Sequence, residues 1–294
     1  SVDCVVTSPP YWKQRDYGTA TQLGLEESPQ QYVASLVLAL REVRRVMKPT
    51  ATLWLNIGDT HAGSRCGPQG KTGLRSDRSF TAPQMEKLCD LPLKSLIGIP
   101  WRVALAMQDD GWILRSNIIW AKPNPRCESV KDRPTKSHEH VFLFVKQGSY
   151  YFDQDAVREP HTMKPQRRHV PHKASQPDGL MPAQTYSGCG VRSEPDVDGH
   201  PLGRNIRDVW KINTQAFPGA HFAVMPPRLV EPCIKAGCPE GGLVLDPFMG
   251  AGTVGLVADR LRRRWVGLEL SAEYARMARD RIRDDCPLFA GVGA

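Results

Sequence analysis

The pattern of apolar and polar residues divides the chain into short apolar runs and longer segments with apolar residues at helical spacing. Short runs bounded by Gly or Pro are typical of buried strands, and repeats every three or four residues are typical of helices. We expect strands at residues 2–6, 52–57, 112–120, 141–145, 242–246 and 265–269, and helices at residues 28–47, 100–109, 226–236, 253–261 and 272–283. Strands that alternate with helices predict an α/β fold.

Two long segments lack this apolar pattern. Residues 60–90 are rich in Gly, Ser, Lys and Arg, which predicts a mobile basic loop over the active face of the sheet. Residues 155–203 are rich in Pro, His, Gly, Gln and Arg, too polar for a core and too long for a plain connection. We therefore expect residues 155–203 to be an insert with a recognition role, between residues 1–154 and residues 204–294 of one larger domain.

The composition limits which binding partners and which cellular compartment the sequence suggests. A net charge of +8 suits a polyanionic partner such as nucleic acid, although many basic proteins bind none. The eight cysteines include no C-x-x-C pair and no histidine at a zinc-finger spacing, which favours reduced thiols in a cytoplasmic protein over a metal site. We find no membrane-spanning run and no signal peptide. The chain opens on a strand without an initiating Met, so we expect further sequence upstream.

A glycine-rich loop follows the expected strand at residues 242–246. Its glycines, Gly250, Gly252 and Gly255, stand between a strand and a helix, where main-chain amides are open to a ligand. The spacing matches the dinucleotide fingerprint, and Glu269 lies where an acid for ribose hydroxyls is needed, so an oxidoreductase stays possible on this motif alone. Only about 40 residues follow the loop, too few for the rest of a dinucleotide domain unless the fold is circularly permuted.

Residues just before the glycines favour a cationic ligand. Asp246 supplies a carboxylate and Phe248 an aromatic ring, and both suit S-adenosylmethionine, which carries ammonium and sulfonium charges.

A proline-rich loop, Ser8-Pro9-Pro10-Tyr11, closes the first expected strand. The two prolines fix its path, and such a loop can present the Ser8 hydroxyl and the Pro9 carbonyl as two rigid hydrogen-bond acceptors. Acceptors of this kind localise the lone pair of an exocyclic amino group on a DNA base, which is otherwise delocalised into the ring. Tyr11 offers a face on which an extruded base can stack. Methyl transfer would then be a direct in-line displacement.

Residues 7–12 and 246–253 together resemble the β-class amino-group DNA methyltransferases, in which the catalytic motif precedes the cofactor motif. The resemblance extends through residues 54–59, 98–102, 120–125, 138–140 and 221–226. It implies a Rossmann-like, circularly permuted fold with a mostly parallel, seven-stranded sheet. Residues 1–154 would be the catalytic half, 204–294 the cofactor-binding half, and 155–203 the target recognition region.

The same resemblance assigns roles to single residues. Phe248, Gly250, Gly252 and Thr253 would hold the methionine part of S-adenosylmethionine, Glu269 the ribose hydroxyls, and Asp246 the amino acid moiety, while His221 to Pro226 would line the pocket. The family also places a strand and an acidic loop upstream of the catalytic motif, before the first residue of this chain. Ser8 resembles the cytosine-N4 members, whereas adenine-N6 members usually carry Asp there, so adenine stays an alternative.

Double-stranded DNA is the expected partner, and a cognate restriction endonuclease is a second one. We assign DNA contacts to aromatic and basic residues near the catalytic loop, in the basic loop and in the insert: Trp12, Arg65, Lys71, Arg75, Lys122, Arg167 and Arg168. A non-catalytic DNA-binding module would explain the charge and the insert, but it leaves the two loops without a use. The sequence does not indicate an oligomeric state.

Three other features have plainer interpretations. Cys233 lies within a helical pattern, so it is expected in the core and not as the nucleophile of a cytosine-C5 methyltransferase. His138, His140 and Cys127 match no zinc spacing, and direct methyl transfer needs no metal. A basic cluster that ends a helix is expected to complement the helix dipole and to aid solubility: Arg260, Arg262, Arg263 and Arg264.

Overall fold

The computed structural model describes residues 1–14, 21–63, 91–161, 200–215 and 224–285. The chain forms two compact units, one of Ser1–Asp153 with Arg207–Ala294 and one of Gln154–Ile206. The expected basic loop lies outside the described residues apart from positions 60–63, and so does most of the expected insert. The smaller unit is held by an antiparallel bridge between Glu159 and Arg204.

The larger unit is built on a seven-stranded sheet within the described residues, in the order β5-β3-β4-β2-β1-β6-β7. The strands are β1 (Val2–Thr7), β2 (Met47–Ile57), β3 (Ile113–Ala121), β4 (His138–Val145), β5 (Val209–Lys211), β6 (Leu243–Asp246) and β7 (Arg264–Gly267). β4 runs antiparallel to both neighbours, and the other pairs are parallel. The predicted mostly parallel α/β sheet is confirmed. β5 was not expected, because a three-residue strand shows no readable pattern.

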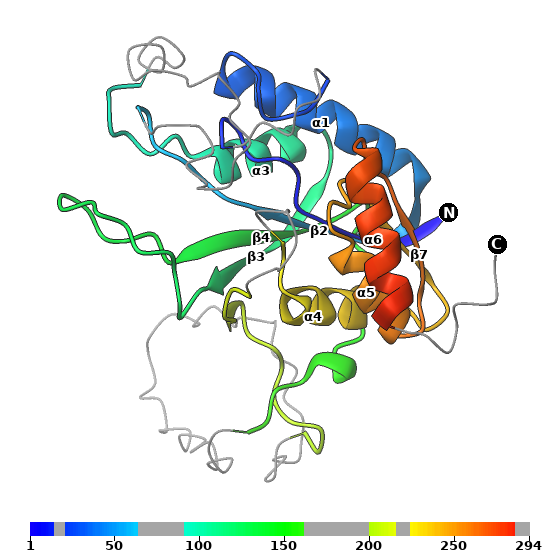
Figure 1. Ribbon diagram of the computed structural model, residues 1–294. Helices are drawn as coiled ribbons and strands as arrows, with labels where there is room; N and C mark the ends of the chain where they lie inside the picture. Colours follow the sequence, from blue (N-terminus) through cyan, green and yellow to red (C-terminus); the bar gives the residue numbers. More distant parts are fainter. Residues whose placement is uncertain (15–20, 64–90, 162–199, 216–223, 286–294) are drawn as a thin grey trace, which may run out of the picture. The chain divides into compact units, whose positions relative to one another are not determined.

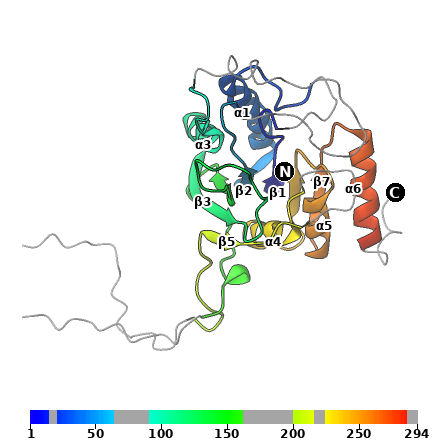
Figure 2. The same ribbon diagram turned by 60° about the vertical axis from the view of Figure 1, so that its left-hand side comes forward.

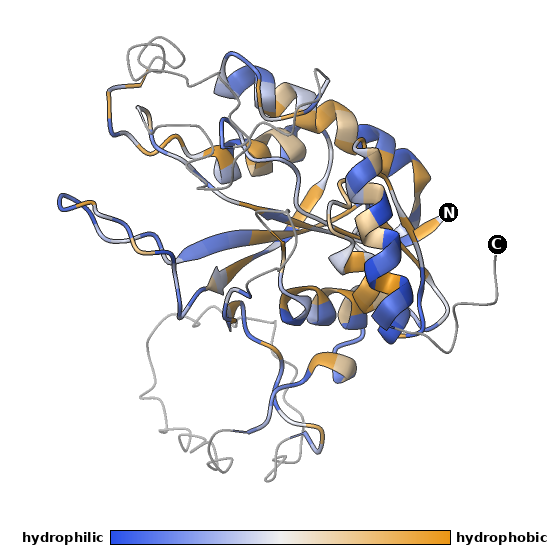
Figure 3. Cartoon of the chain, viewed as in Figure 1, coloured by the Kyte–Doolittle hydropathy of each residue, from blue (hydrophilic) through white to orange (hydrophobic). Residues whose placement is uncertain are grey.

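Helices cover both faces of this sheet (Figure 1 and Figure 2). They are α1 (Pro29–Val46), α3 (Ile99–Asp109), α4 (Pro227–Gly237), α5 (Thr253–Arg260) and α6 (Ala272–Asp285). α1 packs beside α3 on one face, whereas α4 and α5 pack together on the other and α6 packs against α5. Figure 3 shows α6 as a largely hydrophilic ribbon, and only Ala278 and Ile282 of this helix are buried.

The sequence explains the start and the register of α1. The side chain of Ser28 accepts a hydrogen bond from the Gln31 amide while the Gln31 side chain accepts one from the Ser28 amide, which forms a capping box. Pro29 occupies the first turn, where its missing N–H costs nothing. Four apolar residues at the predicted spacing are buried against the sheet: Tyr32, Leu36, Leu40 and Val43.

Two parallel neighbours, β1 and β6, place the two expected loops side by side. Cys4 pairs with Val244 and Val5 with Leu245, so the carboxyl ends of both strands meet at one edge of the sheet. After β1 the chain leads to α1 on one face, and after β6 it leads to α5 on the other. Loops that diverge in this way leave a crevice at the carboxyl ends of the strands, where open α/β sheets bind ligands.

Three plainer expectations can be compared with the structure. Cys233 is 1% exposed in α4, as expected for a core residue. The Arg263 side chain is 9% exposed and donates to the carbonyls of Leu261 and Cys238, which end α5 and α4, so this member of the basic cluster is buried against helix ends and is not solvated. Among the residues that the structure describes, no helix is long and apolar enough to cross a membrane.

Candidate active site

A cavity of about 840 Å³ opens in the crevice between the two loops. The loop after β1 lines one end with Ser8, Pro9, Pro10 and Tyr11, and residues of the loop after β6 line the other. Of the residues expected to hold a cofactor, five line the cavity: Asp246, Phe248, Gly250, Thr253 and Glu269. The two motifs are more than 230 residues apart in sequence, and the sheet brings them to one space.

The glycine loop is tied to β7 by a carboxylate. Glu269 accepts hydrogen bonds from the Gly250 amide at 2.8 Å and from the Ser271 amide at 2.9 Å. These bonds leave part of the Glu269 carboxylate facing the cavity, as a group for hydroxyls requires. Gly252 adopts a φ of +77° at the start of α5, and a Cβ there would lie 2.8 Å from the Ala278 Cβ. Gly252 therefore serves the close approach of α6 and does not line the cavity.

The expected wall from His221 to Pro226 is only partly visible. His221 lies outside the described residues, and Pro226 is buried as the residue that precedes α4. Val224 and Met225 line the cavity in its place. We therefore assign Pro226 to the packing of α4.

Asp246 joins the two motifs directly. Its Oδ1 atom accepts a hydrogen bond from the Thr7 hydroxyl at 2.6 Å and one from the Phe248 amide at 3.0 Å. The residue is 3% exposed, and burial raises the pKa of the Asp246 carboxyl to about 7. The side chain thus clamps β1 to β6 at the point where both loops begin.

Tyr11 is held on one side by a glycine and on the other by polar groups. A Cβ added to Gly58 would lie 2.6 Å from the Tyr11 Cε2 atom, so only glycine leaves room for this ring. Tyr32 donates from its hydroxyl to the Pro10 carbonyl at 2.8 Å, which fixes the preceding turn of the loop. The catalytic loop is therefore positioned by packing from β2 and α1.

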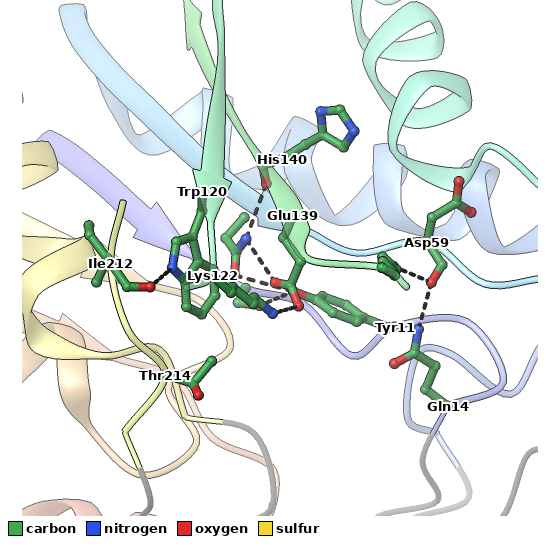
Figure 4. Close-up of polar contacts among 12 residues, drawn as sticks. Tyr11, Gln14, Asp59, Trp120, Lys122, Glu139, His140, Ile212 and Thr214 are labelled. Carbon is green, nitrogen blue, oxygen red and sulfur yellow. Dashed lines mark hydrogen bonds and ion pairs between the residues drawn. The ribbon is translucent and has the colours of Figure 1, made fainter. Parts of the chain in front are cut away.

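Three polar residues that received no catalytic role in the sequence form a cluster at the Tyr11 hydroxyl. Asn56 and Glu139 contact the hydroxyl, and Lys122 pairs with Glu139. Figure 4 shows the Tyr11 ring, the Lys122 ammonium and the Glu139 carboxylate pointing toward one another. They come from β2, from the residue after β3 and from β4. Asn56, a polar residue within the buried run of β2, is the one sequence signal that marks this cluster. The register between β2 and β4 is set by long-range pairing, which the local sequence does not reveal.

One expected DNA contact, that of Trp12, is wrong in this structure. Trp12 is 1% exposed, and its indole N–H donates to the Glu26 carbonyl at 3.0 Å, so its ring belongs to the core and cannot stack on DNA. Lys122 forms an ion pair with Glu139 and lines the cavity, and its contact with DNA stays a prediction. The other residues assigned to DNA lie outside the described residues: Arg65, Lys71, Arg75, Arg167 and Arg168.

No cluster of three or more His, Cys, Asp or Glu side chains suited to a metal ion occurs in the described parts of the chain.

The chain matches known proteins over almost its whole length. Residues 2–280 match the model of a family described as DNA methylase, which groups N6 and N4 methyltransferases. The chain is 44% identical to the Type II methyltransferase M.XycI of Xanthomonas campestris pv. cyanopsidis, over 96% of this chain and 82% of that protein. It is 43% identical to the Type II methyltransferase M.SmaI of Serratia marcescens, over 95% of this chain and 84% of that protein.

Solved structures share the fold. The PvuII DNA methyltransferase, named as cytosine-N4-specific, superposes with a TM-score of 0.61 at 19% identity, over 97% of this chain and 84% of that chain. A complex of M1.HpyAVI with S-adenosylmethionine superposes with a TM-score of 0.52 at 16% identity, over 96% of this chain and 88% of that chain.

The fold and the cavity define a Rossmann-like methyltransferase that uses S-adenosylmethionine. The chain belongs to the N6/N4 DNA methylase family. Its activity is therefore the methylation of an amino group in DNA, and the oxidoreductase and the non-catalytic DNA-binding module are both excluded.

Replacing Gly58 by Ala is expected to slow methyl transfer without weakening cofactor binding. The new methyl group would overlap the Tyr11 ring and push it into the cavity. A small misplacement of a reacting group costs up to about 100-fold in rate, and we expect a loss of roughly 10- to 100-fold. Single-turnover methylation and calorimetric titration with S-adenosylmethionine measure the two properties. Gly148→Ala is the matched control, because a Cβ there meets open space; equal rates for the two variants would contradict the role of Gly58.

Proposed function

We propose that this protein transfers a methyl group from S-adenosylmethionine to the exocyclic N4 amino group of a cytosine in duplex DNA. The observation that supports it best is the single cavity that extends from Ser8 to the glycine loop. A methyl donor at the glycine end and an amino group at the Ser8 end would meet in one enclosed space, as an in-line displacement requires. The other residues that line the cavity belong to either the cofactor end or the base end.

The cofactor end suits S-adenosylmethionine in charge and shape. The Asp246 and Glu269 carboxylates are partners for a cationic group and for hydroxyls, and Phe248 adds an aromatic wall. When bound, the cofactor supplies a methyl group made electrophilic by the sulfonium. The glycine loop lets the main chain approach it, because Gly250 carries no Cβ.

The base end suits an extruded base. The rings of Tyr11 and Trp120 give it aromatic walls, and the Ser8 hydroxyl lies at 3.3 Å from the Tyr11 hydroxyl. Ser8 Oγ and the Pro9 carbonyl would accept the two N–H groups of the target, which localises the nitrogen lone pair for attack on the methyl group. As the nitrogen–methyl bond forms, the sulfur–methyl bond would break and the neutral thioether would leave. The nitrogen would then lose its extra proton to water, and no covalent bond to the enzyme forms.

Cytosine is favoured over adenine by Ser8, since the adenine-N6 relatives in this resemblance usually carry Asp at that position. The test is to incubate the full-length enzyme, duplex DNA and labelled S-adenosylmethionine, then to digest the DNA to nucleosides. We expect 4-methylcytosine as the labelled product. A label found only in 6-methyladenine would overturn the base assignment and leave the site chemistry intact.

Further roles are proposed for the whole protein. Residues 155–203 would read the recognition sequence from the DNA grooves, since this stretch is polar and too long for a plain connection. A restriction endonuclease that shares the recognition site would be the partner, as the Type II naming of M.XycI and M.SmaI suggests by analogy. Such a pair acts on DNA in the cytoplasm.

A further inference from the structure

An ion pair lies at the base end of the cavity. The side chains of Lys122 and Glu139 are 17% and 15% exposed, and their charged ends are in direct contact. Trp120 is paired in register with Glu139, and Lys122 follows two residues after Trp120 on the same side of β3. The Lys122 ammonium also lies 4.2 Å from the centre of the Trp120 ring. Taking two charges out of water is costly, so a pair at this place needs a reason beyond stability.

Glu139 also contacts the catalytic loop. Its Oε2 atom lies 2.8 Å from the Tyr11 hydroxyl and 3.2 Å from the Asn56 amide nitrogen. The Tyr11 hydroxyl has one proton and three acceptors within reach: Glu139, the Asn56 carbonyl oxygen at 3.2 Å and the Ser8 oxygen at 3.3 Å. The shorter contact to a charged acceptor is the stronger one, so Tyr11 donates to Glu139.

The direction of this hydrogen bond decides what Ser8 can do. With its proton committed to Glu139, the Tyr11 oxygen is an acceptor, and Ser8 donates to it at 3.3 Å. The Ser8 oxygen then has only lone pairs left for the cavity. A hydroxyl in this orientation accepts an N–H from the target amino group and cannot offer it a competing proton.

We propose that Glu139 is a positioning residue whose carboxylate, paired with Lys122, orients the hydrogen bonds through Tyr11 so that Ser8 presents an acceptor to the target amino group. This inference rests on the proposed function of Ser8. It gives Lys122 and Glu139 a role in the reaction that does not depend on contact with the cofactor.

The charge of Glu139 is what fixes the direction. Burial acts to raise the pKa of the Glu139 carboxyl, but Lys122, the Tyr11 hydroxyl and the more distant Lys136 together hold this pKa below its usual range. If Glu139 became protonated, it would donate to Tyr11, and the Tyr11 proton would then be shared between the Asn56 carbonyl oxygen and Ser8. Whenever Tyr11 donated to Ser8, the Ser8 proton would turn toward the cavity and compete with acceptance of the target N–H.

Two variants with a pH series test this proposal in the full-length enzyme. Lys122→Met removes the ammonium and keeps much of the side-chain length. Burial should then raise the pKa of Glu139, because the Lys122 charge no longer lowers it. We expect single-turnover methylation by Lys122→Met to fall by about tenfold for each pH unit below the raised pKa, because one proton inactivates the site. All rates are measured at saturating S-adenosylmethionine, so that the pH dependence of cofactor binding through Asp246 does not enter. Under these conditions the wild-type enzyme should lack this acidic limb, since its Glu139 stays ionised.

Glu139→Gln and the combination with Lys122→Met complete the test. The amide keeps an oxygen near Tyr11 without the charge, and we expect a loss of up to about 100-fold in rate, the cost of misplacing a reacting group. Lys122→Met/Glu139→Gln should be slow and free of the acidic limb. The dissociation constant of S-adenosylmethionine should stay within twofold in all three, because the glycine loop is untouched. Tyr11→Phe combined with Glu139→Gln should be no slower than the slower single variant.

Several results would overturn the proposal. They are an unchanged rate in Glu139→Gln, a pH profile of Lys122→Met that matches the wild type, or an acidic limb that persists after Glu139→Gln is added. If Glu139→Gln fails to fold, the presence or absence of the acidic limb in the pH profile of Lys122→Met still tests the proposal. Absence of methyl transfer by the wild-type enzyme would instead contradict the proposed function, and 6-methyladenine as product would change only the base on which the same series is measured.

Discussion

Ser8→Ala is expected to lower the single-turnover rate of methyl transfer by about 100- to 1,000-fold, the range found when one pre-organised hydrogen-bonding group is removed from a reacting centre. The hydroxyl lies in the cavity next to Tyr11, and in the proposed mechanism it accepts from the target amino group. Its contribution arises in the transition state, as the nitrogen becomes pyramidal. The dissociation constant of S-adenosylmethionine should therefore hardly change. Rapid-quench methylation of an oligonucleotide duplex and calorimetric titration measure the two quantities.

Ser149→Ala is the matched control, because Ser149 is exposed and distant in sequence from both motifs. It should be as active as the wild type. A Ser8→Ala enzyme with an unimpaired rate would remove Ser8 from the mechanism. Equal losses in rate and in cofactor affinity would indicate that the substitution disturbs the Thr7 to Asp246 clamp next to it and not the reaction alone.

The sequence predicts those parts of the site that are local. The strand that ends in Ser8-Pro9-Pro10-Tyr11 and the strand that ends in the glycine loop each carry their signal within a dozen residues, and both lie where the pattern places them. The adjacency of β1 and β6 follows from the fold class that alternating strands and helices predict.

Other parts of the site depend on pairing between distant residues. Glu139 reaches Tyr11 because β4 inserts antiparallel beside β2, and nothing near either residue in sequence indicates that register. Trp12 follows the catalytic motif directly and so suggested a DNA contact, yet the chain turns it into the core under α1. Lys122 suggested a DNA contact by its charge, but its ion pair with Glu139, 17 residues further along, has no local signal in the sequence.

Asp246 is expected to couple the protonation state of the enzyme to its stability. The folded-state pKa of about 7 exceeds the ordinary value of 3.8, so the folded protein binds the proton more tightly than the unfolded chain does. This contribution to stability is complete below 3.8 and is lost as the pH rises to about 7. The difference between the two pKa values corresponds to about 4 kcal/mol. Urea unfolding of the wild type and of Asp246→Asn between pH 5 and pH 8 should show the variant gaining in relative stability as the pH rises.

Binding of the cofactor should offset part of the free energy that ionisation of the buried Asp246 carboxyl costs. Asp246 lines the cavity, and a cationic ligand there favours the ionised carboxylate. Binding of S-adenosylmethionine by the wild type should therefore release protons between about pH 5.5 and pH 7 and should strengthen by up to about tenfold for each pH unit in that range, since a single group titrates. Asp246→Asn keeps acceptors for Thr7 and Phe248, and its affinity should not vary with pH in this window. Wild-type affinity that is equal at pH 5.5 and pH 7 would mean that Asp246 clamps the two strands without sensing the charge of the cofactor.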